Sequence, residues 1–169
     1  FGQYTLDYPN AEVKESMLEY MISDLRYERG VMATPMVIQL YEAFRDNDLD
    51  QVIQLTKGIF KNIPSHIFLS KAEAYYHSLI YLVFFYLGQY IESEVNTNNG
   101  RLDAVIQSST HIYILEFKLD ESAETALAQI KDRGYADKYV ADTRPKVLLG
   151  INFSSQAKTV NDWLMEVIE

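Results

Sequence analysis

The order of helical and extended segments after residue 70 limits the folds open to this chain more than any other feature. Apolar residues at helical spacing predict one long helix over residues 70–87, with Ser70 as its cap and Gly88 after its end. Three short β-type runs follow, at residues 90–96, 102–107 and 112–118. Polar turn residues separate these runs, at Asn98-Asn99-Gly100 and at Ser108-Ser109-Thr110.

The segments that come next decide how such strands can be arranged. A helix is predicted over residues 122–138 and a buried strand over residues 146–153, while the segment from Lys158 fits either a strand or a helix. A helix that joins strands of one sheet is typical of a mixed sheet with helices packed on it. We therefore expect an α/β (α+β) fold with a mixed β-sheet flanked by helices.

Residues 1–69 are predicted to form a helical annex, separate from a domain over residues 70–169. Three helices are expected there, over residues 10–29, 34–45 and 51–61. Asn10 can cap the first helix, and Thr34 can cap the second with Pro35 in its first turn. The segment Asn62-Ile63-Pro64 ends the third helix and marks the boundary.

Charged residues interrupt the apolar strands at 102–107 and 112–118. Glu116 and Lys118 alternate onto one face of the second of these strands, and Asp103 stands in an apolar stretch of the first. Buried charges are costly unless they are paired or bind a metal. A hairpin between the two strands, reading RLDAVIQSSTHIYILEFK, can bring Asp103 and Glu116 together.

Two converging carboxylates and an ammonium group form a coherent site for phosphodiester hydrolysis. Carboxylate oxygens suit a hard cation such as Mg²⁺ or Mn²⁺, and the backbone carbonyl of Phe117 could add a ligand. The metal would acidify a bound water and offset charge on the phosphate. Lys118 could orient or deprotonate that water, or stabilise developing negative charge.

A plain structural reading competes with this one. Asp103 can be a residue at a turn edge, and Glu116 and Lys118 can be a solvated pair. Glu73 on the preceding helix and Gln129 on the following helix favour a site by their order and spacing along the chain. Taken singly, each of these two also reads as an ordinary surface residue.

This order of motifs resembles the PD-(D/E)XK nuclease superfamily with its restriction-endonuclease-like fold. The family core has a helix with Glu, a strand with Asp, a strand with (D/E)xK and a helix that often bears Gln. Gly100-Arg101-Leu102-Asp103 looks like the G-x-h-D entry of resolvase-like members, with Leu102 where the family name has Pro. The stretch EVNTNNGRLDAVI…IYILEFKLDESAETALAQI is similar to the nuclease domain at the C-terminus of AAA-ATPase-like proteins, and YPNAEVKESM resembles the linker after that ATPase domain. The resemblance covers residues 70–153 and, more weakly, the helical segment before them.

The resemblance implies a metal site made by four groups. Its expected ligands are Asp103, Glu116, the Phe117 backbone carbonyl and Glu73, with Mg²⁺ or Mn²⁺ as the ion. Lys118 is expected to assist the nucleophilic water.

The resemblance also implies residues that position the substrate. Gln129 would position the catalytic lysine or the substrate backbone, with Tyr135 packing nearby. Arg101, Tyr135 and Lys131 are the expected substrate-binding residues. Glu94 is a further acidic candidate, although on an edge strand it could be only a solvated side chain.

The amino-acid composition limits the cellular compartments and the kinds of reactive site that are expected for this chain. The chain has 169 residues and no cysteine, which excludes disulfides, zinc–thiolate sites and cysteine nucleophiles and suits a cytoplasmic protein. The apolar run at residues 79–87 is too short to span a bilayer, so no membrane association is expected. Because the chain starts at Phe1 rather than Met, we expect it to be part of a longer protein, with an ATPase domain before it as the resemblance implies.

Net charge opposes strong binding of nucleic acid. The chain carries 15 basic and 24 acidic side chains, a net charge of −9, whereas phosphate contacts need Lys and Arg. The basic residues between positions 118 and 146, including Arg144 and Lys146, could line one face. We expect a metal-dependent nuclease acting on DNA or RNA, and keep as the alternative a catalytically silent nuclease-like module that serves interaction or regulation.

Overall fold

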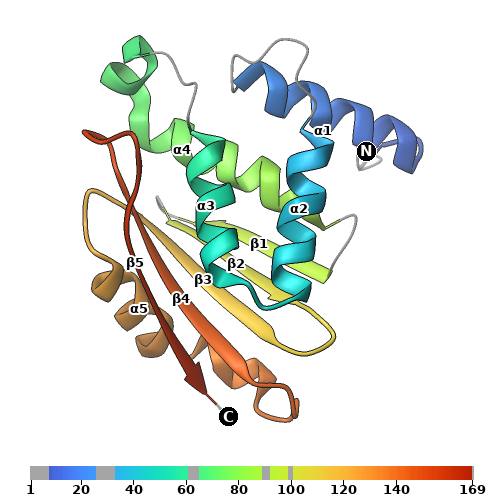
Figure 1. Ribbon diagram of the computed structural model, residues 1–169. Coiled ribbons are helices and arrows are strands. Elements are labelled where there is room, and N and C mark those ends of the chain that lie inside the picture. Colours follow the sequence, from blue (N-terminus) through green and yellow to red (C-terminus); the bar gives the residue numbers. More distant parts are fainter. Residues whose placement is uncertain (1–7, 26–32, 61–64, 89–91, 99–100, 169) are drawn as a thin grey trace, which may run out of the picture.

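The structure is a computed structural model that describes residues 8–25, 33–60, 65–88, 92–98 and 101–168 (Figure 1). Within these ranges, the side chains of residues 25, 65–74, 92–98 and 101–103 are not among those described. The predicted stop of the first helix at Arg29-Gly30 and the predicted break at Asn62-Ile63-Pro64 lie outside the described residues. So do Asn99 and Gly100 of the predicted hairpin turn.

A five-stranded sheet in the order β1-β2-β3-β4-β5 forms the centre of the described structure. Its strands are β1 (Glu92–Asn98), β2 (Arg101–Gln107), β3 (Ile112–Leu119), β4 (Lys146–Ser154) and β5 (Thr159–Ile168). The first three strands and the last two pair antiparallel, while β3 and β4 pair parallel. The predicted mixed sheet flanked by helices is therefore confirmed, and the ambiguous segment after Lys158 is a strand that pairs with β4.

Four helices lie on one side of this sheet, and the first of them packs on the fourth (Figure 1). They are α1 (Ala11–Leu25), α2 (Thr34–Arg45), α3 (Leu49–Ile59) and α4 (Ser65–Leu87). Tyr113 of β3 packs against Phe44 of α2 with ring centroids 5.0 Å apart, and its hydroxyl donates to the Phe44 carbonyl at 2.9 Å. The helices before residue 70 thus share a hydrophobic core with the sheet, and the expected boundary at 69/70 falls within α4. The division into two domains stays a prediction.

Two predicted helix starts and one predicted cap differ from the observed ones. Helix α3 begins at Leu49, two residues before its predicted start. Helix α4 begins at Ser65, directly after Pro64, because no helix breaker lies between that residue and Leu87. Helix α2 begins at Thr34, but this residue does not cap it. The carboxylate of Glu19 in α1 accepts from the Thr34 amide at 2.9 Å and from its hydroxyl at 2.5 Å, so a neighbouring helix satisfies the free amide. Asn10 does cap α1 by accepting from the Val13 amide at 2.9 Å.

Helix α5 (Ala123–Asp132) covers the opposite face of the sheet (Figure 1). The helix expected over residues 122–138 ends at Asp132, and a 3-10 helix, η1 (Tyr135–Tyr139), follows it. Gly134 separates the two with a φ of 60°, a left-handed conformation that only glycine adopts at little cost. Among the described residues, no helix is both long enough and apolar enough to cross a membrane.

Candidate active site

Strand alternation divides β3 between the two sides of the sheet. Phe117 packs under α4, where its ring lies 5.5 Å from that of Phe84. Glu116 and Lys118 therefore face α5, together with Ile112 and Ile114, which belong to the hydrophobic cluster under that helix. The side chain of Glu116 is 0% exposed and that of Lys118 is 11% exposed. Both charges lie in a setting where they need close polar partners.

Gln129 of α5 supplies such a partner to both charges. Its amide nitrogen Nε2 donates to Glu116 Oε1 at 2.5 Å, and its Oε1 accepts from Lys118 Nζ at 2.6 Å. Lys118 Nζ also lies 3.6 Å from Glu116 Oε1, and Glu121 Oε1 lies 3.9 Å away at the solvent side. One amide thus bridges a buried carboxylate and a lysine, and fixes the distance between them.

The hairpin register places the second predicted acid. Asp103 of β2 is the direct partner of Glu116, and Leu102 is the partner of Phe117. Directly opposite positions of an antiparallel pair share one face of the sheet. Position 103 is therefore on the same face as the Glu116–Gln129–Lys118 cluster.

Four predicted site residues are placed only by their backbone, because their side chains are outside the described set. Glu73 lies in the middle of α4. Glu94 lies on β1 opposite Val105, and Arg101 is the first residue of β2. With Asp103, these residues keep the roles predicted for them as predictions.

Two predicted substrate-binding residues make contacts away from this cluster. Lys131 forms an ion pair with Glu166 of β5, with Nζ and Oε2 2.5 Å apart. Tyr135 packs against the hydrophobic cluster that includes Ile112 at the start of β3, whereas Glu116 and Lys118 lie near its end.

Gly150 of β4 allows α5 to lie close to the sheet beside Glu116, its register partner. A Cβ atom on Gly150 would collide with the carbonyl oxygen of Ala123, and would lie 2.8 Å from the amide nitrogen of Leu127. Because both atoms belong to the backbone of α5, glycine here sets the height of the helix that carries Gln129. A glycine inside an apolar strand is the sequence signal that could have identified such a close approach.

Asn152 holds the chain just after Lys118, and sequence reasoning missed it as well. It is the register partner of Lys118 on β4 and is 1% exposed. Its Oδ1 accepts from the Glu121 amide at 3.1 Å, and its Nδ2 donates to the Glu121 carbonyl at 2.9 Å and to Asn161 Oδ1 at 3.1 Å. A polar residue in the apolar run KVLLGINFS is the signal that could have identified it.

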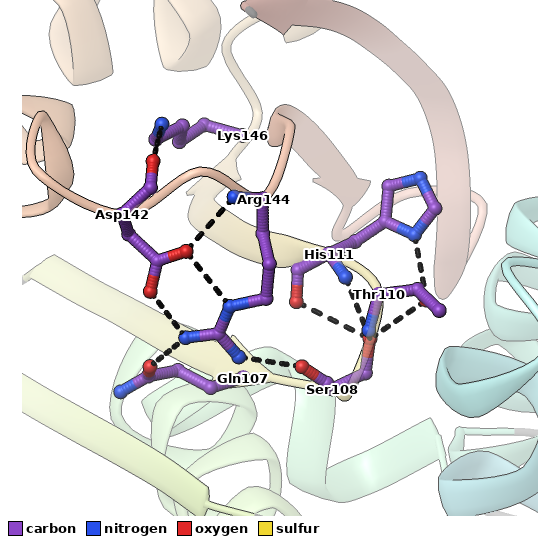
Figure 2. Close-up of polar contacts among 7 residues, drawn as sticks. All are labelled: Gln107, Ser108, Thr110, His111, Asp142, Arg144 and Lys146. Atoms are coloured by element: carbon purple, nitrogen blue, oxygen red, sulfur yellow. Dashed lines mark hydrogen bonds and ion pairs between the residues drawn. The ribbon is translucent and has the colours of Figure 1, made fainter.

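The opposite end of the β2–β3 hairpin is held by a polar network (Figure 2). Arg144 donates to the Ser108 carbonyl at 2.6 Å and to Gln107 Oε1 at 2.8 Å, and binds both carboxylate oxygens of Asp142. Lys146 is 6% exposed and donates to the Asp142 carbonyl at 2.5 Å. Burial contradicts the expectation that Lys146 lines a basic face for nucleic acid, whereas for Arg144, whose side chain is 27% exposed, that role stays a prediction.

Hydrogen bonds from Arg144 also change the acidity of its partner. The guanidinium and then the backbone amide of Arg144 lower the pKa of Asp142 to about 2. This carboxylate remains charged under all but strongly acidic conditions, which keeps the network intact.

The donor groups near Glu116 fit a hard divalent cation in their chemistry. Such ions prefer carboxylate, carbonyl and water oxygens, and Glu116 contributes a buried carboxylate opposite Asp103. Among the residues that the structure describes, no three His, Asp or Glu side chains gather closely enough to hold a metal ion. The other predicted acidic ligands, Asp103 and Glu73, are the two whose side chains are not described.

Comparison with known proteins identifies the family of this arrangement. The family model of the PD-(D/E)XK nuclease superfamily matches residues 71–163, more than half of the chain. The chain is also 36% identical, over 171 aligned residues, to an "uncharacterized protein in vnfD 5'region" of Azotobacter chroococcum mcd 1. That alignment covers 97% of this chain and 33% of the relative, so the chain spans about a third of the length of the curated relative. The matched segment contains the strand pair, the cluster of Glu116, Lys118 and Gln129, and the helix that completes it, and the chain belongs to the PD-(D/E)XK nuclease superfamily.

Proposed function

We propose that the chain is a divalent-metal-dependent nuclease that hydrolyses phosphodiester bonds in DNA or RNA. The observation that carries this proposal is the Glu116–Gln129–Lys118 cluster, buried opposite Asp103 in the hairpin register. A purely structural ion pair would be served as well by two charges in direct contact. Here a neutral amide also bonds to both charged groups, whose Nζ and Oε1 atoms lie 3.6 Å apart near the end of β3.

In this proposal the residues divide into ligands and groups that act on the water. Asp103, Glu116, the Phe117 carbonyl and Glu73 would hold Mg²⁺ or Mn²⁺. When bound, such a cation supplies Lewis-acid chemistry, because it offsets charge on the scissile phosphate and acidifies a water. Lys118 has three N–H donors, of which Gln129 accepts one, so its ammonium can also hold the attacking water or the phosphate.

Gln129 has a positioning role in this scheme. Its amide cannot carry charge, so it orients Lys118 without neutralising it. Asn152 supports the same arrangement from β4 by fixing the backbone of Glu121, three residues after Lys118. Arg101, Lys131 and Tyr135 remain proposed substrate-binding residues.

The setting of the nuclease is also a proposal. We infer that the chain works in the cytoplasm as the C-terminal part of a longer protein with an ATPase domain. The relative from Azotobacter chroococcum, about three times longer than the aligned segment, supports a longer protein. A full-length gene product that hydrolyses no ATP would contradict the ATPase part of this proposal.

Cleavage assays on linear, nicked and branched DNA and on RNA, with Mg²⁺ or Mn²⁺, test the enzymatic proposal. Lys118→Ala and Asp103→Ala should each lower the rate by about 100-fold or more, the usual contribution of a group that acts on the nucleophile. Glu124→Gln is the matched control, since it removes an exposed carboxylate from α5 and should leave the rate unchanged. A wild-type protein that cleaves none of these substrates, or variants that cleave equally well, would refute the proposal.

The net charge of −9 favours one alternative, a silent nuclease-like module that serves interaction or regulation. That module would show no cleavage with either metal, although its fold and its Glu116–Gln129–Lys118 cluster would be intact. The same assay therefore separates the two readings.

A further inference from the structure

A hollow of about 620 Å³ lies between the end of α3 and the turn that joins β4 to β5. Gln54 and Lys57 line it from the helix, and Lys158 and Thr159 line it from the turn. None of the described residues that line it is acidic, in a chain where acidic side chains outnumber basic ones by 24 to 15. Two lysines, an amide and a hydroxyl are therefore gathered in one cationic hollow.

This hollow lies at the same end of the sheet as Lys118. Strands β3 and β4 are parallel, with Lys118 opposite Asn152, so both strands end there. Asp120, two residues after Lys118, ties the two ends together. Its carboxylate accepts from the Ser155 amide at 2.8 Å and from the Ser155 hydroxyl at 2.5 Å. The turn that carries Lys158 is thus joined directly to the chain that leaves Lys118 (Figure 1).

Lys158 is held at this place by its backbone. Its φ is 57°, a left-handed conformation that is uncommon for a residue with a side chain, and its amide donates to the Ser154 carbonyl at 2.7 Å. Glycine would occupy the same turn with less strain. Strained backbone conformations are concentrated at functional sites, so the conformation of Lys158 suggests that its side chain has a function.

Space and rigidity favour a ligand on the α3 side as well. A Cβ atom built on Gly58 meets no atom within 4 Å, so the helix leaves the hollow open where Lys57 borders it. Phe60 closes the inner side, with its ring packed at 4.8 Å on that of Phe153 of β4. The hollow is therefore open to solvent, cationic and built on packed elements.

We propose that this hollow binds a phosphodiester of the nucleic-acid backbone outside the bond that is cleaved, through Lys57 and Lys158. The inference rests on the proposed function, since it takes a polynucleotide as the ligand. Lys118 lies on the α5 side of the sheet and the hollow lies on the α3 side, so a strand bound at both places would cross this end of the sheet. The subsite also accounts for how a chain of net charge −9 holds a polyanion, because it concentrates positive charge where the strand passes.

Binding measured without cleavage tests this subsite. A short fluorescein-labelled oligonucleotide is titrated with protein in EDTA across a range of NaCl, and fluorescence anisotropy gives the dependence of log K on log salt. For Lys57→Gln with Lys158→Gln, the slope should fall in magnitude by about 1.4 on a single strand or about 1.8 on a duplex, because each phosphate contact contributes about 0.7 or 0.9. Glutamine keeps most of the length of each side chain, so the turn and helix should stay folded.

Two further doubles make the result specific. Lys14→Gln with Arg45→Gln removes the same charge from α1 and from the last turn of α2, outside the residues that line the hollow, and should leave the slope unchanged. Lys57→Arg with Lys158→Arg keeps the charge and should retain the wild-type slope. The proposal would be overturned if both glutamine doubles lost the same amount of slope, or if Lys57→Gln with Lys158→Gln kept the wild-type slope. It would also be overturned if the wild type did not bind the oligonucleotide.

The two proposals can fail separately. A protein that binds with the expected slopes but cleaves nothing with any metal retains the subsite and loses the nuclease function. A protein that cleaves, while Lys57→Gln with Lys158→Gln binds with the wild-type slope, retains the nuclease function and loses the subsite.

Discussion

Replacing Gly150 with alanine should destabilise the fold by pushing α5 away from the sheet. The added Cβ atom would collide with the Ala123 carbonyl oxygen, and would lie 2.8 Å from the Leu127 amide nitrogen and 3.1 Å from the Ala126 Cβ atom. The first two are backbone atoms, so no side-chain rotation can relieve the contact. Helix α5 must shift, and with it Gln129, which bridges the cluster.

The expected cost follows from two opposing terms. An extra methyl group in a well-packed region costs roughly 1–3 kcal/mol. Removing glycine from a strand interior returns about 0.5–1 kcal/mol. The difference between these terms runs from about 0 to 2.5 kcal/mol. Because the closest atoms belong to the backbone of α5, we expect the free energy of unfolding of Gly150→Ala to fall by about 1–2 kcal/mol, in the upper part of that range. For a chain of this size each kcal/mol corresponds to about 2–4 °C, so the midpoint temperature should fall by about 2–8 °C.

Urea unfolding followed by tryptophan fluorescence measures this change close to its origin. Trp163 is the single tryptophan of the chain and is the register partner of Ile151, the neighbour of Gly150. Gly58→Ala is the matched control, because its Cβ atom would meet nothing within 4 Å on the last turn of α3. Better helix propensity should raise the stability of that variant by up to about 1 kcal/mol.

The two alanine variants should thus change stability in opposite directions. If Gly150→Ala proves as stable as the wild type, the close approach of α5 to the sheet is not what this glycine provides. Loss of stability in both variants would also refute the reasoning, since it would indicate a general intolerance of alanine at these positions.

Three other substitutions test the polar contacts. Gln129→Leu removes both bridging bonds and should lower the free energy of unfolding by roughly 1–3 kcal/mol in urea titrations, because Glu116 stays buried. Arg144 lowers the pKa of Asp142 to about 2 in the folded chain, below the value of about 3.9 in the unfolded chain. The Asp142 carboxylate therefore stabilises the fold fully above pH about 3.9, and this contribution is lost as the pH falls toward 2. Asp142→Asn should therefore show a smaller loss of stability in acid unfolding titrations over this range. Burial raises the pKa of Tyr113 to about 12, above its unfolded value of about 10, so stability should fall between these values in alkali. Tyr113→Phe should reduce that fall, with the buried Tyr76, whose pKa is also raised by burial, accounting for part of the remainder, and should cost about 1 kcal/mol at neutral pH, by chemical denaturation.

The sequence was sufficient to predict the first four strands and the shared face of Glu116 and Lys118, but it left the segment that forms β5 ambiguous. Alternation along β3 and the polar turn at Ser108-Ser109-Thr110 are local signals, and together they set a register in which Asp103 is opposite Glu116. Helix boundaries were less accurate. The cap of α2 comes from Glu19 on another helix, which no local pattern around Thr34 could indicate.

The tertiary structure decided which distant groups meet, because contact depends on how elements cross rather than on their spacing in the chain. The bridge from Gln129 to Glu116 and Lys118 exists because Gly150 lets α5 lie low on the sheet. The sequence likewise did not indicate which groups each basic residue would contact in the folded chain. Hydrogen bonds across the hairpin end commit Arg144 to the fold, while the packing of α3 against the β4–β5 turn leaves Lys57 beside Lys158. A count of charges fixes the net value of −9, but only the folded chain determines which basic residues line the same hollow.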